Sequence, residues 1–466
     1  MKIKHVFLII ISAVLISYWI AFSAGTFFIL ALSFFTYFCM RNFLKKEDRK
    51  FVLTLFLLSL IFRLVLSTGY YLCAYSLRKG VDFFGDARGY SNNAAYISYV
   101  IRGNDLNSFP YTDNSGINSL ADSYNYLLNR YKGALPPFSF RIDGLVYFIG
   151  FLYSIFDYSP LMVKWLNCLF FTLAGIILYF IAKQIFNSRT SRAGVIALLL
   201  WPSNFLWSIS GLKESVTFLL LVCCIWSMLK FFNKRRFVFF LSFAASLTVI
   251  WFIRIHLAVS FMVTFIILSF FRLRNSQRLM TILFIFIMFL FFVSVFNLDI
   301  PQILSRIHKE FFANTIGTNR AILTIRGAQT YRIYPARFSE PSHVYDINCL
   351  EFLTSLFKGL FFFLTVPLPW MITKSKFFLI VFPQVMIWYL LLPFSILGGV
   401  VALRYRFREA IVVASQVFLI TILFSLVEAN VGTAFRHRDI LMPFYIIFAM
   451  GGIFWVFGKK ELGIRE

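Results

Sequence analysis

The feature that most constrains this chain is a succession of apolar runs of about 20 residues, separated by short segments rich in lysine and arginine. A helix rises about 1.5 Å per residue, so a run of this length can cross the hydrocarbon core of a bilayer. Hydrophobic residues make up 60% and charged residues 14% of the chain, whereas soluble domains are roughly 45–50% apolar and about 25% charged. The sequence therefore predicts an all-α polytopic membrane protein.

We predict about twelve membrane spans and two long outer loops. The predicted spans are about 6–22, 24–40, 51–73, 159–184, 193–209, 211–231, 237–252, 254–271, 279–297, 378–402, 410–428 and 440–457. Two more apolar stretches, about 139–156 and 352–371, would place short basic loops on the outer side if they crossed. Laid along the outer surface as amphipathic helices, they leave every short basic loop in the cytoplasm, as the positive-inside rule requires.

These spans divide the chain into five parts. They are N-terminal helices (1–73), a first outer loop (74–158), a membrane core (159–297), a second outer loop (298–377) and C-terminal helices (378–466). The net charge of +25 is spread over the loops between spans, and membrane orientation accounts for about half of the basic residues. We therefore expect a lipid bilayer, and no nucleic acid, as a partner.

A few basic residues lie where orientation gives no reason for a positive charge. Lys213, Arg254, Arg436 and Arg438 occupy short outer turns, and Arg63 lies near the middle of an apolar helix. A charge inside a membrane costs on the order of 3 kcal/mol and usually faces a cavity or a partner. Each cation could be structural, but together they predict an anion-binding surface on the outer side.

The first outer loop begins VDFFGDARGYSNNAAYISYV, in which Asp86 and Tyr90 are four residues apart. This spacing predicts a short helix that starts just after Asp86. A carboxylate at a helix N-terminus is stabilised as the anion. Asp86 is therefore either a helix cap or a general base that takes a proton from a hydroxyl group. Asp82 is a weaker second candidate.

Further features follow in a characteristic order. A Pro-rich segment (ALPPFSFRIDGL) leads into a surface helix, Lys164 stands at the outer start of a span, and RHRDILMPF opens the last span. From about 80 to 460 this order resembles the GT-C superfamily of glycosyltransferases, in particular protein O-mannosyltransferases and lipid A aminoarabinose transferases. In that family the loop Asp is usually followed by Glu; here Ala87 follows Asp86.

The resemblance implies a function and a set of site residues. A GT-C-like enzyme would move a sugar from a polyprenyl-phosphate donor to a glycan, glycolipid or protein acceptor, on the periplasmic or extracytoplasmic side of the cell membrane. Asp86 would be the catalytic base. The substrate-binding residues, mostly cations for the carrier phosphate, would be Arg436, Arg438, Lys164, Lys213, Arg254, Tyr90 and Arg63. No cofactor is expected, and no tight cluster of acids predicts a metal site.

Two other function classes stay open. A polymerase or ligase of cell-surface polysaccharide would also combine many helices, large outer loops and paired arginines. A transporter or flippase is disfavoured because the chain has no repeated halves.

Some side chains of the outer loops are expected to support the site. We expect Glu214 and Glu428 to orient the outer cations, with Glu428 as the partner of Arg63. In the second outer loop, Tyr331, Tyr334 and Tyr345 could stack against sugar rings, or the loop could be a basic surface on the lipid.

Overall fold

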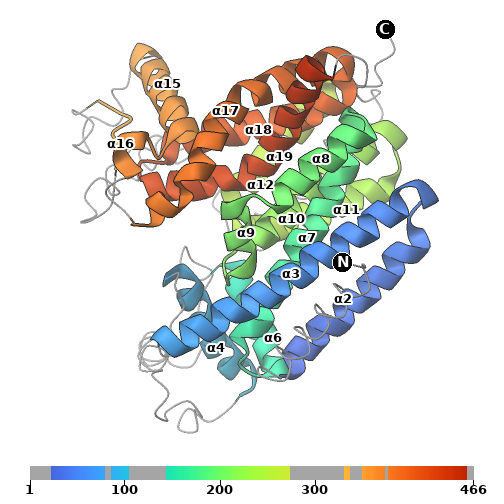
Figure 1. Ribbon diagram of the computed structural model, residues 1–466, viewed down its shortest axis with the longest axis vertical. Helices are drawn as coiled ribbons and strands as arrows, with labels where there is room; N and C mark the ends of the chain where they lie inside the picture. Colours follow the sequence, from blue (N-terminus) through green and yellow to red (C-terminus); the bar gives the residue numbers. More distant parts are fainter. Residues whose placement is uncertain are drawn as a thin grey trace, which may run out of the picture. The chain divides into compact units, whose positions relative to one another are not determined.

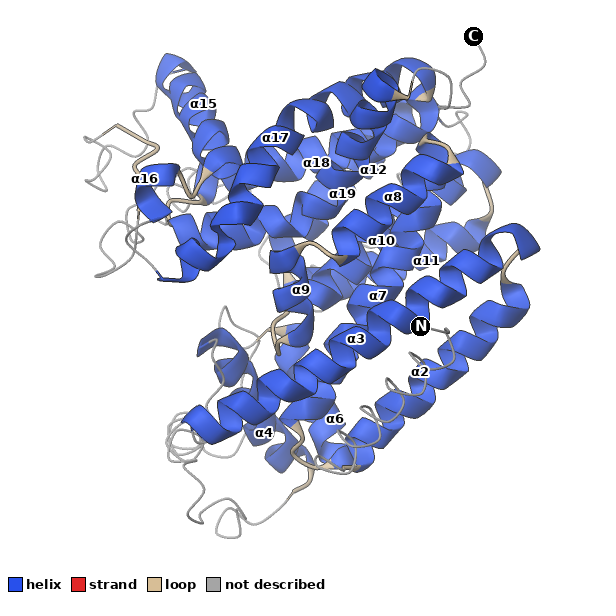
Figure 2. Ribbon diagram, viewed as in Figure 1, coloured by secondary structure: helices blue, strands red, loops and turns tan. Residues whose placement is uncertain are grey.

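The computed structural model describes residues 23–78, 85–103, 143–272, 330–335, 349–372 and 376–458. Nearly all of these residues are helical, and none of them belongs to a β-strand (Figure 2). Thr330 and Asn430 form an isolated antiparallel bridge. The prediction of an all-α protein is confirmed. The predicted spans 6–22 and 279–297 lie outside the described residues.

Seven helices of the described part are long and apolar enough to cross a membrane. They are α2 (Ala24–Phe43), Lys46–Cys73 of α3 (Lys46–Arg78), α7 (Pro160–Ile185), α10 (Glu214–Lys234), Val381–Tyr405 of α17 (Lys376–Tyr405), α18 (Phe407–Val427) and α19 (Val431–Phe457). Each coincides with a predicted span. These helices fit a multi-pass membrane protein, but they do not fit the predicted number of twelve spans.

One predicted span, 193–209, is wrong because the chain forms two shorter helices there. They are α8 (Ser188–Leu199) and α9 (Pro202–Ile209), with Pro202 in the first turn of α9. Proline lacks a backbone N–H and disfavours helical conformation in the residue before it, so it begins a helix more readily than it continues one. Two other predicted spans coincide with α11 (Phe237–Ile253) and α12 (Ile255–Arg272), whose apolar parts are shorter than those of the seven.

The two stretches predicted to lie along the surface also form helices. Residues 139–156 contain α6 (Gly144–Phe156), and 352–371 contain most of α15 (Cys349–Thr365) followed by the short α16 (Pro369–Ile372). The 13 residues of α6 extend about 20 Å, which is less than the roughly 30 Å of a bilayer core. Neither α6 nor α15 is among the seven described helices that are long and apolar enough to cross a membrane.

The helices form two compact units. Unit 1 comprises Met1–Phe180, Val195–Cys223 and Ala245–Ile255; unit 2 comprises Ile181–Gly194, Cys224–Ala244 and His256–Glu466. In unit 1, α2 and α3 lie side by side, α9 packs on α3, and α4 (Gly85–Ile101) packs on α6 (Figure 1). In unit 2, α17, α18 and α19 pack together and α15 contacts α18 and α19.

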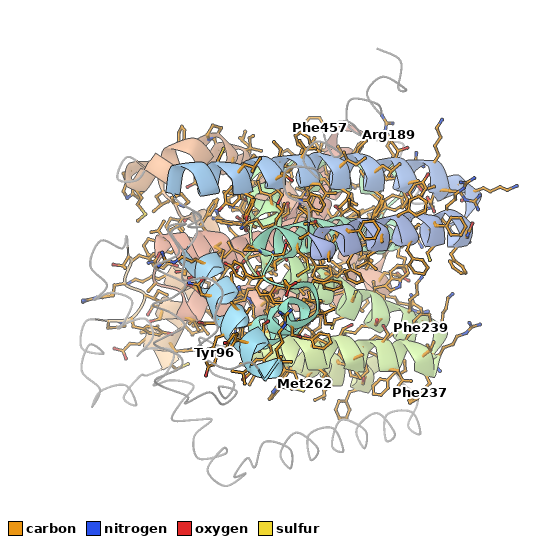
Figure 3. All side chains as sticks on the ribbon, turned by 90° about the horizontal axis from the view of Figure 1, so that it is seen from below. Tyr96, Arg189, Phe237, Phe239, Met262 and Phe457 are labelled. Carbon is orange, nitrogen blue, oxygen red and sulfur yellow. The ribbon has the colours of Figure 1, made fainter. Side chains whose placement is uncertain are left out.

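Large apolar side chains remain on the outer surfaces of the helices. Phe237 at the start of α11 and Phe457 at the end of α19 point outward (Figure 3) and are 59% and 75% exposed. Exposed large apolar side chains also occur along most of the other helices, and surface of this kind marks contact with another apolar phase. In a multi-pass protein that phase is the acyl chains of the bilayer.

Candidate functional site

Asp86 lies in the first turn of α4 and is exposed. The predicted helix is present, but it begins at Gly85, so Asp86 lies within its first turn rather than just before it. The positive end of the helix dipole favours the ionised carboxylate. One turn later, the ring of Tyr90 lies beneath an ammonium group: Nζ of Lys213 is 5.7 Å from the ring centroid. The structure thus brings Asp86, Tyr90 and Lys213 into one region of unit 1. Asp82 lies outside the described residues.

Lys213 and Arg254 each form an ion pair with a carboxylate of unit 1. Nζ of Lys213 lies 2.7 Å from Oδ2 of Asp143, and Nη2 of Arg254 lies 2.9 Å from Oε1 of Glu214. The side chains of the second pair are only 4% and 5% exposed. Glu214 thus pairs with Arg254, one of the cations that it was expected to orient. We call Asp143, Lys213, Glu214 and Arg254 the Lys213 cluster.

The two pairs of the Lys213 cluster influence each other. Burial, followed by the positive charge of Arg254, lowers the pKa of Lys213, whereas Asp143 acts in the opposite direction. The other carboxylate oxygen of Asp143 accepts a hydrogen bond of 3.1 Å from the backbone N–H of Leu145 and so caps α6. Asp143 therefore fixes the position of Lys213 relative to α6.

The turn that carries Lys213 is held by two neighbouring helices. The side-chain amide of Asn167 in α7 donates hydrogen bonds of 2.7 Å to the carbonyls of both Ser210 and Leu212. The hydroxyl of Ser67 in α3 donates to the carbonyl of Ile209 at 3.1 Å. The α9–α10 turn is therefore a fixed platform for its lysine.

Lys164 adds a third cation in the same region. It is 3% exposed, and its Nζ lies 5.1 Å from the centroid of the Tyr70 ring. A β-carbon added at Gly211 would lie 3.6 Å from this Nζ and 3.5 Å from Cβ of Ala87. The ammonium of Lys164 and the first turn of α4 therefore both lie next to Gly211. Lys164 is thus close to Ala87, the residue that follows Asp86.

Arg63 has a different environment from the one predicted. Its Nε, Nη1 and Nη2 donate hydrogen bonds to the hydroxyl of Ser208 (2.9 Å), the hydroxyl of Ser59 (2.7 Å) and the carbonyl of Leu199 (2.8 Å). The rings of Phe171 and Phe205 each lie 4.9 Å from the guanidinium. The prediction that Glu428 pairs with Arg63 is therefore wrong, because neutral oxygens from α3, α8 and α9 satisfy this buried charge.

The RHRD segment lies inside a helix rather than on a turn. Asn430 caps α19, which begins at Val431, about nine residues before the predicted span. Arg436 and Arg438 are two positions apart, which corresponds to about 200° around a helix. They therefore project from opposite sides of α19: Arg438 is 1% exposed, whereas Arg436 is only partly buried.

Unit 2 contains a second group of polar side chains, which we call the Arg438 cluster: Tyr331, Glu428, His437 and Arg438. Nη1 of Arg438 donates a 2.8 Å hydrogen bond to the carbonyl of Leu364. Nδ1 of His437 contacts Oε1 of Glu428. The Thr330–Asn430 bridge and a 2.8 Å hydrogen bond from Tyr331 N–H to the carbonyl of Ala429 anchor the segment that carries Tyr331.

The tyrosines considered for sugar stacking face the interior of unit 2. Tyr331 is 5% exposed, and its ring stacks on Phe362 with centroids 4.6 Å apart. Tyr334 is equally buried, and its hydroxyl donates to the carbonyl of Leu426 at 2.8 Å. Burial raises the pKa of both phenols, so both hydroxyls stay protonated. Tyr345 lies outside the described residues.

Sequence reasoning missed two residues of these clusters. Asp143 was not identified as the partner of Lys213, although an Asp immediately before an apolar run is a helix-capping signal. Tyr331 was considered only as a stacking surface, and no local pattern predicts its position beside the Arg438 cluster.

Neither the described geometry nor known proteins assign these clusters to an established site. Within the described ranges, no group of three or more His, Cys, Asp or Glu side chains is placed to hold a metal ion. No protein-family model, no curated protein and no solved structure matches this chain.

Proposed function

We propose that the chain is a membrane glycosyltransferase that moves a sugar from a polyprenyl-phosphate carrier to a hydroxyl group at the extracytoplasmic face of the cell membrane. One observation carries the proposal. An exposed carboxylate, Asp86, lies in the same region of unit 1 as the buried ammonium group of Lys164 and the largely shielded one of Lys213, at the ends of apolar helices. A lipid-linked donor has its tail in the bilayer and its phosphate at the interface, and it needs this combination of groups.

Asp86 would act as the general base on the acceptor. Its carboxylate takes the proton of the acceptor hydroxyl while the hydroxyl oxygen forms a bond to the anomeric carbon. The bond between that carbon and the phosphate oxygen breaks, and its electron pair stays on the leaving phosphate. The exposure of Asp86 suits a base that meets a glycan, glycolipid or protein acceptor arriving from outside the membrane.

Lys164 and Lys213 would stabilise the negative charge that develops on the leaving phosphate. Both are largely shielded from water, and a fixed charge acts more strongly in such surroundings. An ammonium group has three N–H donors, so its bond to Asp143 leaves donors of Lys213 for a ligand. Arg254, held by Glu214, would add positive charge, and Tyr90 would position the ammonium of Lys213.

Two residues implied by the sequence are left out of this site. The hydrogen bonds of Arg63 assign it to the packing of α3 on α8 and α9. Arg436 points away from the side of α19 on which Arg438 lies. Arg438 belongs to unit 2.

The experiment that tests this proposal compares two Asp→Asn variants of the full chain in lipid nanodiscs. Decaprenyl phosphates that carry mannose, glucose, galactose or aminoarabinose serve as donors, and release of decaprenyl phosphate is followed by mass spectrometry. Asp86→Asn should lower the rate at least a hundredfold, because loss of a general base typically costs 10²–10⁴. Asp157→Asn is the matched control, because that carboxylate is 79% exposed and pairs with Arg102 at 2.7 Å.

Two results would contradict the proposal. Turnover by Asp86→Asn at the wild-type rate would remove Asp86 from the chemistry. The second result is that the wild-type protein releases decaprenyl phosphate from none of the donors, although membrane extract is present as a source of acceptors. The protein would then not be a glycosyltransferase that uses these lipids.

A further inference from the structure

Among the described residues, the guanidinium of Arg438 donates hydrogen bonds through only one of its nitrogens, Nη1. Its Nη1 donates to the carbonyl of Leu364 at 2.8 Å, with a longer contact of 3.5 Å to Phe363. Within the described part of the chain, neither Nε nor Nη2 donates a hydrogen bond, and Nε is fully buried. A buried donor without an acceptor costs about 1–3 kcal/mol, and more when it is charged. The fold therefore keeps the Nε–Nη2 edge at a cost, and this is the edge on which arginine binds oxyanions bidentately.

A third donor without a partner lies in the same part of unit 2. The hydroxyl of Tyr331 is buried and has no hydrogen-bond partner among the described residues, and it interacts electrostatically with both Glu428 and Arg438. Because burial raises the pKa of this phenol, the group is a donor rather than a phenolate. Two N–H groups and one O–H group thus stand unused in one buried region of unit 2.

The arrangement is built by rigid elements rather than by a free loop. Arg438 lies on α19 between aromatic rings, 5.5 Å from the centroid of Trp388 and 5.4 Å from that of Phe435. Tyr331 is fixed by its backbone hydrogen bond to Ala429 and by stacking on Phe362. A site with locked side chains needs little reorganisation when a ligand arrives.

The charges around the two residues permit an anion. Glu428 and Asp439 are the acids next to the site, and Glu428 contacts His437, which offsets its charge when the imidazole is protonated. Arg332, next to Tyr331 in the sequence, adds positive charge to that of Arg438.

We propose that Arg438 and Tyr331 form a binding site for a phosphate group, which accepts hydrogen bonds from Nε and Nη2 of Arg438 and from the hydroxyl of Tyr331. Three donors match the three terminal oxygens of a phosphate monoester, whereas a carboxylate has only two oxygens. The site rests on the geometry of unit 2 alone and does not depend on sugar transfer. Its phosphate would belong either to a lipid headgroup or to a soluble ligand.

The test measures binding to the full chain in nanodiscs made of the uncharged lipid phosphatidylcholine. Binding of inorganic phosphate is measured by isothermal titration calorimetry. Decaprenyl phosphate is incorporated into the nanodiscs at increasing fractions. Its binding is detected by its displacement of inorganic phosphate and by its effect on the thermal stability of the protein. Binding of both probes indicates a site open to soluble ligands, and binding of decaprenyl phosphate alone indicates a lipid headgroup site. If neither probe binds, or if acetate binds more tightly than phosphate, the proposal is overturned.

Two Tyr→Phe variants separate binding from folding. Tyr331→Phe removes an unused hydroxyl, so the Kd for the bound probe should rise about tenfold while the thermal midpoint stays the same or increases. Tyr334→Phe is the matched control, because it removes a buried hydroxyl that donates to Leu426. It should lower the midpoint and leave the Kd within about twofold of wild type.

A third variant tests the arginine. Arg438→Lys keeps the positive charge but loses the fork, and its Kd should rise by more than that of Tyr331→Phe. An unchanged Kd in Tyr331→Phe and Arg438→Lys would place the phosphate elsewhere, even if the wild-type protein binds it. The result is independent of Asp86, so an inactive glycosyltransferase assay leaves this test intact.

Discussion

The Arg254–Glu214 pair provides a quantitative test of how unit 1 holds its charges. Both side chains are almost completely buried, at 4% and 5% exposure, and Nη2 lies 2.9 Å from Oε1. Removing one partner from a buried pair costs about 3–5 kcal/mol because the other charge stays buried, whereas replacing both with apolar residues is often nearly neutral. Glu214→Leu and Arg254→Met should therefore each be strongly destabilising, and the double variant should recover most of the loss.

The expected size of the effect follows from the size of the unit. For a cooperative unit of about 200 residues, 1 kcal/mol shifts the thermal midpoint by roughly 2–4 °C. Each single variant should then lower the midpoint by about 6–20 °C, and the double variant by less than about 5 °C. The interaction energy from this double-mutant cycle should be at least about 2 kcal/mol.

The assay follows intrinsic fluorescence of the nine tryptophans during heating of the full chain in nanodiscs. Asp157→Asn serves as the control, because that carboxylate is 79% exposed in its pair with Arg102 and exposed pairs contribute less than about 1 kcal/mol. If the losses of the two single variants simply added in the double variant, the two side chains would act independently. The buried pair could then not be what holds Arg254 in place.

Two further predictions concern the site and the orientation of the chain. Gly211→Leu should reduce sugar transfer at least tenfold, because the larger side chain fills the space beside Lys164, whereas Gly211→Ala adds only ordinary contacts and should keep most of the activity. The release of decaprenyl phosphate measures the rate of both variants. Equal rates for the two variants would place the donor elsewhere. If the proposed orientation is correct, a membrane-impermeant maleimide should label Cys73 in intact cells when the other exposed cysteine, Cys349, is replaced by alanine. Asn233→Cys, in a Cys73→Ala, Cys349→Ala background, should be labelled only after permeabilisation. Labelling of residue 233 from outside would reverse the topology and move Asp86 to the cytoplasm.

The positions of most helices could be predicted because a membrane span leaves a strong signal along the sequence. A run of about 20 apolar residues has few alternatives to a helix, since a backbone in lipid must satisfy its hydrogen bonds internally. The errors occurred where a local signal opposed hydrophobicity. Pro202 divides an apolar run into α8 and α9, and Asn430 starts α19 in front of a charged segment that looked like a turn. In both cases the helix boundary followed capping and proline chemistry rather than mean apolarity.

The candidate site could be predicted only in part, because its partners come from distant segments. The spacing of Asp86 and Tyr90 identifies one helix surface, and Glu214 is adjacent to Lys213 in the sequence. Asp143, in contrast, lies far from Lys213 along the chain, and only the packing of α6 near the α9–α10 turn brings them together. Neighbours in sequence can also mislead: Arg436 and Arg438 look like one anion site, but the helix separates them.

The hydrogen bonds of each cation discriminate between roles that the sequence leaves equivalent. Arg63 and Arg438 are both buried, and the resemblance assigns both of them to substrate binding. All three guanidinium nitrogens of Arg63 donate hydrogen bonds to oxygens of the protein, so a ligand would have to displace existing bonds. Arg438 donates through Nη1 alone to described residues, so a ligand would satisfy donors that folding has left at a cost. We therefore expect an oxyanion to bind more favourably at Arg438 than at Arg63, because burial without saturation is the property that indicates a site.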